Sequence, residues 1–498
     1  MARGTRAALP AANKGTPRRT GAWRERTRPR RRAVRWAAET RETAGGTVEE
    51  GQWVDDFSQL QDRRADEPLP LPVVPKKCRV VLVRHGQSTW NAEGRMQGCS
   101  DFSVLTGKGQ GQARKTHVML QAFEYDALHH SPLKRAAETA EIVWGADRDA
   151  PVHVHASLRE IDLYTMQGLL KKEGAAKFPD EYAKWKDAPA EFELPVGDGV
   201  QQPVVELWHR GSLAWHDVLV GADAGAAESR LVVAHNAINQ AMIGTALGLP
   251  PRFFRRVLQN NAAVSTFVFN PDGDGGMQVR VGAVNATPGV RSLRPRHGAP
   301  AQVVLVRHVE VTDEGAPTDV GWTEASRVAG LLRRCNVSAI AASPERSALA
   351  TAGALVEELR AKPPHPEALA EAAAIRAADA EDAEGGESTV QPRGVRLLAM
   401  ESLEAPQEGA WNAAGDAWEA LCEEADRAQD GTTVVAFARA EMVAALVARA
   451  LGADNAAFVH AFESDMPFGA LTCILRPKGG SKDAVLRSFN TGAVDGVA

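Results

Sequence analysis

The sequence predicts an α/β fold made of two tandem copies of one domain, each a mostly parallel sheet flanked by helices. Short apolar runs rich in β-branched residues, such as 79–83 and 231–234, alternate with segments of helical periodicity. This alternation is typical of a parallel sheet that is buried on both faces. Four segments of the first half also recur in the same order in the second half, which indicates an internal duplication. The recurring pairs are 80–89 with 303–312, Ser131-Pro132 with Ser343-Pro344, Glu160…Gly168 with Glu401…Gly409, and 246–248 with 450–452.

Local signals predict the elements of the first copy. The hydroxyl of Thr106 can accept a hydrogen bond from a first-turn N–H group and so begin a helix. Pro132 can open the next helix, because the N–H that it lacks has no partner in a first turn. A glycine-rich turn between two alternating segments predicts a closing hairpin. In order we expect strand 79–83, helix 106–123, a helix from 132, strand 231–234, a helix to 247, and the hairpin 264–269 with 277–284.

Composition limits the classes of function. The 498 residues carry 58 Lys and Arg against 63 Asp and Glu, and 44% are hydrophobic, which is typical of a globular protein. Residues 1–45 hold twelve Arg and one Lys against three Glu, so the remaining body is acidic. An acidic body argues against nucleic acid as the main partner. No apolar run approaches the ~20 residues that span a bilayer, and we expect no membrane partner. Five scattered cysteines without a Cys-x-x-Cys pair predict reduced thiols.

The basic head and the proline-rich stretches predict the domain boundaries. The head is rich in Arg and poor in acids, as organelle transit peptides are, although Thr rather than Ser supplies its hydroxyls. A solvated basic tail is the alternative. An Ala- and Glu-rich insert at 361–394 has the composition of a disordered loop. We predict a transit peptide and disordered linker over 1–76, a catalytic domain over 77–285, a linker over 286–301 and a degenerate second domain over 302–498.

Polar side chains follow the two buried strands of the first copy. Arg84 and His85 come directly after strand 79–83, and His235 comes directly after strand 231–234. Because ligands bind at the carboxyl ends of parallel strands, we expect these side chains to lie at a binding edge. A single histidine there could also be structural, but Arg135 and Glu160 lie between the two strands in sequence. Guanidinium groups match phosphoryl oxygens bidentately, so the set predicts a phosphate site. It is not a nucleotide P-loop, because no Gly-x-x-x-x-Gly-Lys segment is present.

In this order, these residues resemble the histidine phosphatase family, which is also called phosphoglycerate-mutase-like. The resemblance covers about 77–285 and rests on 82–91 (LVRHGQSTWN), 131–136 (SPLKRA), Glu160 and Ala234-His235. Finer features resemble the two-domain plastid 2-carboxy-D-arabinitol-1-phosphatases of plants and algae, a family with a transit peptide and a divergent second copy. These features are 102–106 (FSVLT), 158–164 (LREIDLY), 167–174 (QGLLKKEG) and 234–240 (AHNAINQ).

The resemblance implies a role for each site residue. His85 would attack phosphorus and carry a phosphohistidine, which splits one difficult displacement into two easier ones. Glu160 would protonate the leaving alkoxide and then activate water. No metal and no cofactor would be required, because cationic side chains stabilise the developing charge. The phosphoryl oxygens would be bound by Arg84, Arg135 and His235, with Asn91 and Gln97 as neutral donors.

The resemblance also implies a substrate class, a small phosphorylated sugar or sugar acid. The family's substrate is 2-carboxy-D-arabinitol 1-phosphate, a Rubisco inhibitor, and its compartment is the chloroplast stroma. In mutases of the family an Arg directly follows the acid/base Glu, whereas this chain has Ile161 at that position, which favours hydrolysis over phosphoryl return. The alternatives are a broader sugar-phosphate or bisphosphate phosphatase, a phosphoglycerate mutase, and a non-catalytic phospholigand sensor that uses both copies.

The second copy keeps only part of the set. Arg307-His308 is retained, and Glu401 matches the acid/base Glu by spacing. Ser347 stands at the position of the second Arg, and Arg439 lies near the end of the second strand, where no His follows. We therefore expect a structural or regulatory second domain. Phosphate binding with Arg439 as the replacement cation is the alternative.

Overall fold

The structure is a computed structural model that describes most of both copies. It describes residues 70–491 except 147, 149, 221–227, 273–275, 289–292, 294–300, 334, 362–394, 405–409, 429, 454–455, 464–465 and 477–483. The predicted transit peptide, most of the predicted 286–301 linker and nearly all of the 361–394 insert therefore lie outside the described residues.

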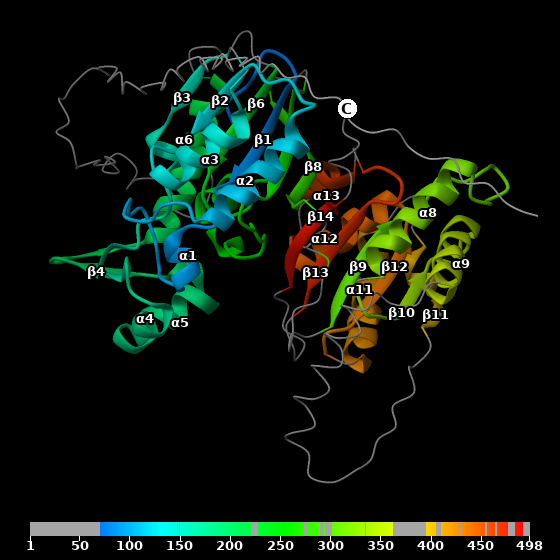
Figure 1. The fold of residues 1–498 in the computed structure, drawn as a ribbon. Coiled ribbons are helices and arrows are strands. Elements are labelled where there is room, and N and C mark those ends of the chain that lie inside the picture. Colours follow the sequence, from blue (N-terminus) through cyan, green and yellow to red (C-terminus); the bar gives the residue numbers. More distant parts are fainter. Residues whose placement is uncertain are drawn as a thin grey trace, which may run out of the picture. The chain divides into compact units, whose positions relative to one another are not determined.

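The first copy consists of strands that alternate with helices and end in a hairpin (Figure 1). Its strands are β1 (Cys78–Arg84), β2 (Ala127–His130), β3 (Val152–Val154), β4 (Leu194–Val196), β5 (Gly199–Gln201), β6 (Ser229–Ala234), β7 (Val264–Pro271) and β8 (Met277–Ala286). Its helices are α1 (Thr89–Glu93), α2 (Gly107–Leu120), α3 (Lys134–Trp144), α4 (Lys171–Lys177), α5 (Pro179–Asp187), α6 (Pro203–Val220) and α7 (Asn236–Ala246).

The sheet of the first copy has the order β8-β7-β1-β6-β2-β3. β1, β6, β2 and β3 run parallel, and β7 and β8 form the antiparallel hairpin. The expected parallel sheet, the N-cap at Thr106 and the closing hairpin are all confirmed. β2 and β3 carried no clear apolar run in the sequence, and the small hairpin of β4 with β5 was not predicted.

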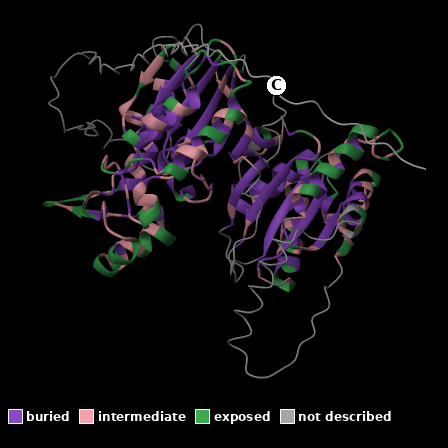
Figure 2. Cartoon of the chain, viewed as in Figure 1, coloured by how far each residue is buried: buried purple, intermediate pink, exposed green. Residues whose placement is uncertain are grey.

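Alternate residues of β1 pack against helices on opposite faces of the sheet. Val81 and Val83 belong to a buried cluster with residues of α2 and α3. Val80 and Leu82 belong to another cluster, with residues of α6 and α7. Figure 2 shows the result for the central strands, which are buried along most of their length, whereas exposed residues gather on the outer surfaces of the helices and on the small hairpin of β4 with β5. The continuous apolar run at 79–83 reflects this burial on both faces.

The second copy repeats the main sheet of the first and most of its flanking helices, but its described residues contain no counterpart of α1, α4, α5 or the hairpin of β4 with β5. Its strands are β9 (Gln302–Arg307), β10 (Val337–Ala342), β11 (Arg396–Ala399), β12 (Thr433–Ala438), β13 (Leu471–Leu475) and β14 (Val485–Thr491). Its helices are α8 (Asp319–Leu332), α9 (Arg346–Ala361), α11 (Ala410–Arg427), α12 (Ala440–Leu451) and α13 (Ala456–Glu463). The strand order β14-β13-β9-β12-β10-β11 matches that of the first copy, and β14 pairs antiparallel with β8, so the two sheets continue into one.

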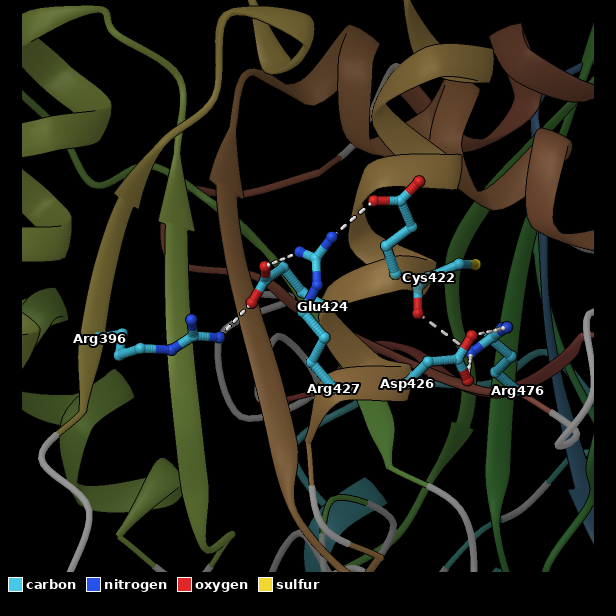
Figure 3. A network of polar contacts seen from close by, with 7 residues as sticks. Arg396, Cys422, Glu424, Asp426, Arg427 and Arg476 are labelled. Carbon is cyan, nitrogen blue, oxygen red and sulfur yellow. Dashed lines mark hydrogen bonds and ion pairs between the residues drawn. The ribbon is translucent and has the colours of Figure 1, made fainter.

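Ion pairs attach α11 to the sheet of the second copy (Figure 3). Glu424 on α11 pairs with Arg396 of β11 and with Arg427 one turn further along the helix. Asp426 forms two hydrogen bonds with Arg476, which directly follows β13 and also donates to the carbonyl of Cys422 at 3.1 Å. The second copy thus has one buried hydrophobic cluster of its own and shares a second, larger cluster with the first copy.

Candidate active site

The site lies where β1 and β6 end side by side. The two strands pair in parallel register up to Arg84 and Ala234, so the next residues, His85 and His235, become neighbours. Their ring centroids are 5.1 Å apart in an edge-to-face arrangement, and both side chains are buried. The two histidines therefore lie at one edge of the sheet, as the order of the parallel strands predicts.

A backbone contact fixes the tautomer of His85. Its Nδ1 lies 2.6 Å from the carbonyl oxygen of Gly86. Because a carbonyl only accepts, Nδ1 carries the proton and Nε2 of the neutral ring keeps its lone pair. Burial, followed by the positive charges of Arg135 and Arg84, holds the pKa of His85 well below its usual value of 6.5. The ring is therefore neutral at physiological pH, as a nucleophile must be.

Two arginines, the buried Arg135 and the half-buried Arg84, lie beside this ring and are each held by backbone carbonyls. Arg84 donates from Nη1 to the carbonyl of Gln259 at 2.6 Å. Arg135 donates from Nη1 and Nη2 to the carbonyls of Ser100 and Gly98 at 2.7 and 2.9 Å. Burial, with the neighbouring charge of Arg135, lowers the pKa of Arg84 to about 10, so the guanidinium stays charged at neutral pH.

His235 is fixed by a hydroxyl. Its Nε2 lies 2.7 Å from Oγ of Ser131, which itself accepts from the N–H of Leu133 at 3.3 Å. The Ser131 hydroxyl can then donate to Nε2, which places the ring proton of His235 on Nδ1. Within the described part of the chain, His235 Nδ1, Arg84 Nε and Arg135 Nε are all buried without a hydrogen-bond partner. Three buried donors in one cluster indicate a site for an oxyanion.

Glu160 completes the cluster and at the same time caps a helix. Its Oε1 accepts from the N–H groups of Ala237 and Ile238 at 2.9 and 3.2 Å, in the first turn of α7. A carboxylate is favoured at the positive end of a helix dipole. Its charge acts on both Arg84 and Arg135, so it belongs to the same electrostatic cluster as the two cations.

Asn91 and Gln97 lie around this cluster in hydrogen bonds to the loops that build it. Oδ1 of Asn91 accepts from Nδ2 of Asn261 at 3.1 Å, and the same Nδ2 donates to the carbonyl of His85 at 3.2 Å. Oε1 of Gln97 accepts from the hydroxyl of Ser88 at 2.8 Å. Their expected role as neutral donors to phosphoryl oxygens stays a prediction.

Some residues of the site were not singled out from sequence. Arg210 on α6 donates to the carbonyl of Glu160 at 3.0 Å and so fixes the backbone of that residue. Gln259 and Asn261 hold Arg84 and His85 from a loop that precedes β7. The available signal was the amide-rich run 259–261 directly before the closing hairpin. Polar loop residues next to a buried strand often support a site.

Comparisons with known proteins agree with this geometry. The sequence pattern of the "Histidine phosphatase superfamily (branch 1)" matches residues 80–280 and again residues 295–485. The chain belongs to the histidine phosphatase superfamily. It contains two tandem domains of that superfamily, as the duplicated fold shows.

Curated relatives are named as phosphatases and as mutases. The chain is 36% identical over 441 residues to a "Probable 2-carboxy-D-arabinitol-1-phosphatase" of Arabidopsis thaliana. The aligned region covers 83% of this chain and 87% of that one. It is 41% identical over 311 residues to a "2-carboxy-D-arabinitol-1-phosphatase" of Triticum aestivum, covering 59% of this chain and 61% of that one. A "Probable phosphoglycerate mutase GpmB" of Enterobacter sp. (strain 638) is 32% identical over 191 residues, covering 38% of this chain and 83% of that one. The chain is a phosphoric monoester hydrolase of the histidine phosphatase superfamily.

The second histidine phosphatase domain keeps Arg307 and His308 but not the counterparts of Arg135 and His235. His308 directs Nδ1 to the carbonyl of Val309 at 2.9 Å, as His85 does to that of Gly86. β9 and β12 pair up to Arg307 and Ala438, so Arg439 stands where the first copy has His235. Arg439 forms an ion pair with Glu345 at 2.8 Å. The cation expected to replace the lost histidine is therefore already neutralised by a carboxylate of its own domain.

The match of Glu401 to Glu160 by spacing was wrong. The 3₁₀ turn η7 (Glu401–Leu403) of the second copy corresponds to η2 (Ala156–Leu158) of the first. In both copies the residue before the turn donates its N–H to the strand carbonyl, His155 to His130 and Met400 to Ala342. Glu401 therefore corresponds to Ala156, and Ala405 takes the sequence position of Glu160. The register of Ser347 with Arg135 is confirmed, because each carbonyl accepts from the threonine four residues later.

No helix among the described residues is long and apolar enough to cross a membrane. In the same part of the chain, no group of three or more His, Cys, Asp or Glu side chains is placed to hold a metal ion.

Proposed function

We propose that this hydrolase removes the phosphoryl group of a phosphorylated sugar acid through a phosphohistidine on His85. The observation that carries the proposal is the convergence of three unpartnered buried donors, on Arg84, Arg135 and His235, around a neutral imidazole. Such donors are arranged to receive the charge that develops on phosphoryl oxygens during transfer. The two relatives named as 2-carboxy-D-arabinitol-1-phosphatases support a sugar acid as the substrate.

The chemistry runs in two displacements. In the first, which starts with Glu160 protonated, Nε2 of His85 attacks phosphorus, and the bond from phosphorus to the ester oxygen breaks while Glu160 gives that oxygen its proton. In the second, Glu160 takes a proton from water, the hydroxide attacks phosphorus, and the bond from phosphorus to Nε2 breaks. Orthophosphate leaves and His85 returns to its neutral form. Arg84 and Arg135 remain in place throughout, because backbone carbonyls hold both guanidinium groups.

A panel of substrates tests the specificity. We expect kcat/KM to be highest for 2-carboxy-D-arabinitol 1-phosphate, and lower for sugar bisphosphates, simple sugar phosphates and 3-phosphoglycerate. Release of orthophosphate is the measurement, and conversion of 3-phosphoglycerate to its 2-isomer is followed in parallel. Equal kcat/KM across the panel would contradict the sugar-acid assignment, whereas isomer formation without orthophosphate would indicate a mutase. Ile161 after Glu160, in place of the arginine expected of a mutase, argues for hydrolysis.

We also propose that the hydrolase works in the plastid stroma. Residues 1–45 combine a large excess of Arg with few acids, as plastid transit peptides do. The similarity to relatives from two plants supports a plastid location. A fusion of residues 1–76 to a fluorescent protein is expected to enter plastids, and a fusion that lacks them is expected to stay outside. Cytosolic fluorescence from the first fusion would contradict the proposal.

A further inference from the structure

The two copies are joined by a reciprocal pair of asparagines. Asn285 on β8 donates from Nδ2 to the carbonyl of Arg487 on β14 at 2.6 Å. Asn490 on β14 donates from Nδ2 to the carbonyl of Gly282 on β8 at 2.6 Å. Both asparagines are buried and have φ values of 54° and 50°, a left-handed conformation that Asn adopts more readily than most residues. Each accepting carbonyl lies three residues before the opposite asparagine, so the junction has local twofold symmetry.

β14 of the second copy also binds a loop of the first. The N–H of Leu258 donates to the carbonyl of Leu486 at 3.0 Å, and the N–H of Leu486 donates to the carbonyl of Arg256 at 2.7 Å. Residues 256–258 are thereby paired with the backbone of β14, with Val257 in a parallel bridge to Leu486. A loop that pairs with a sheet loses the conformational freedom that exposed loops usually keep.

The next residues of this loop hold Arg84 and His85, which we call the catalytic pair. The carbonyl of Gln259 accepts from Arg84, and the N–H of Ala262 donates to the carbonyls of Arg84 and His85 at 3.0 and 3.2 Å. Between them, the N–H of Asn260 donates to Oδ1 of Asn285 at 2.5 Å. The side chain of Asn285 therefore binds β14 through Nδ2 and binds residues 256–262, the catalytic loop, through Oδ1.

The equivalent connection is interrupted in the second copy. Arg307 donates to the carbonyl of Met466 as Arg84 does to that of Gln259, so Met466 corresponds to Gln259. The following residue, which corresponds to Asn260, is Pro467, and a proline has no N–H to donate. Accordingly, Oδ1 of Asn490 is buried and accepts no hydrogen bond from the described residues. The connection is thus complete only in the copy that has the full catalytic set.

We propose that the second copy is a positioning domain, which holds residues 256–262 of the first copy in the conformation that orients Arg84 and His85, with Asn285 as the connecting positioning residue. Catalysis by oriented groups is sensitive to displacements of about 1 Å, which can cost ~10²-fold in rate. A backbone carbonyl that fixes a phosphoryl-binding guanidinium must therefore itself be fixed. This positioning role requires no ligand in the second copy and no chemistry at His308.

Two matched glycine variants of the full chain test the proposal. Glycine suits the positive φ at both positions, so each variant removes a side chain without adding backbone strain. Asn285→Gly removes the bond between the copies together with the bond to Asn260, whereas Asn490→Gly removes only a bond between the copies. With para-nitrophenyl phosphate, we expect Asn285→Gly to lower kcat by roughly tenfold or more, because the catalytic pair is displaced. We expect Asn490→Gly to retain the kcat of the wild type, with a smaller loss of Tm because it removes one hydrogen bond rather than two.

A third variant tests the other end of the connection if Asn285→Gly does not fold. Asn260→Pro copies Pro467 into the first copy and removes one N–H while the contacts of Asn285 with β14 remain. The backbone at this position accommodates proline in the second copy. We expect kcat to fall about as far as in Asn285→Gly, with a smaller loss of Tm. An unchanged kcat in Asn260→Pro, or an equal fall in Asn285→Gly and Asn490→Gly, would overturn the proposal. Failure of the wild-type chain to hydrolyse any phosphate ester would instead count against the catalytic assignment.

Discussion

His85→Ala is expected to lower turnover by at least about 10⁴-fold, since removal of a nucleophile from a catalytic set that acts as a unit has effects of this size or larger. The side chain is buried, and Nδ1 donates to the carbonyl of Gly86, which leaves Nε2 as the attacking atom. Incubation with a ³²P-labelled substrate followed by denaturation in alkali is the second measurement. Wild type should retain label on the protein and His85→Ala should not. Label retained by the variant would show that another residue is the nucleophile.

His308→Ala is the matched control for this experiment. His308 has the same position and the same contact to a following carbonyl in the second copy. Its domain has Ser347 in place of the second arginine and Arg439 in an ion pair with Glu345. We therefore expect unchanged turnover and unchanged labelling in this variant. A collapse of activity without a loss of Tm would show that the second copy takes part in the chemistry.

Glu160→Gln is expected to lower turnover of alkyl phosphates by ~10²–10⁴-fold, the usual contribution of a general acid/base. Glutamine keeps an oxygen that can accept from the N–H groups at the start of α7, so the cap is largely preserved. The two displacements should respond differently to an activated leaving group. With para-nitrophenyl phosphate the first displacement needs no proton, whereas the attack of water still requires a base. The labelled phosphoenzyme should therefore accumulate in the variant.

The amount of phosphoenzyme distinguishes the acid/base role from a structural one. If Glu160 served only to cap α7, Glu160→Gln and Glu160→Ala would lower Tm and would not raise the labelled fraction. An unchanged labelled fraction in a folded Glu160→Gln variant would contradict the second step of the mechanism. Glu173→Gln is a suitable control, because Glu173 accepts from a helix-end N–H group of α4 and is exposed.

The sequence was sufficient to predict those site residues that follow directly from strand ends. Arg84 ends one buried parallel strand, His85 and His235 each directly follow such a strand, and the carboxyl ends of these strands meet at one edge. Arg135 was predictable because Ser131-Pro132 indicates the start of a helix and Arg135 lies in the first turn of that helix. These signals are local in the sequence, and the topology of the sheet then determines where the residues lie relative to one another.

Other parts of the site depend on contacts between distant segments and left no such signal. Asn285 lies within an ordinary closing strand, and only its hydrogen bonds with Asn260 and Arg487 show that its side chain connects residues 256–262 with β14. Glu401 illustrates the opposite error, since equal spacing in two loops suggested an equivalence that the hydrogen bonds of the adjoining strands contradict. Loops tolerate insertions and deletions, so the spacing within them does not preserve register.

The continuous sheet formed by β8 and β14 resembles a subunit interface of a symmetric dimer that is contained in one chain. In a dimer of separate chains, the positioning contact would be lost on dilution below the dissociation constant. A covalent connection replaces that dependence with a fixed effective concentration, roughly millimolar for short flexible linkers. In a homodimer both sides of the interface have the same sequence, whereas in this chain the two copies can change separately. One copy can therefore lose its reactive groups while it continues to support the other. Cleavage of the chain between residues 286 and 302 would restore the dependence on concentration.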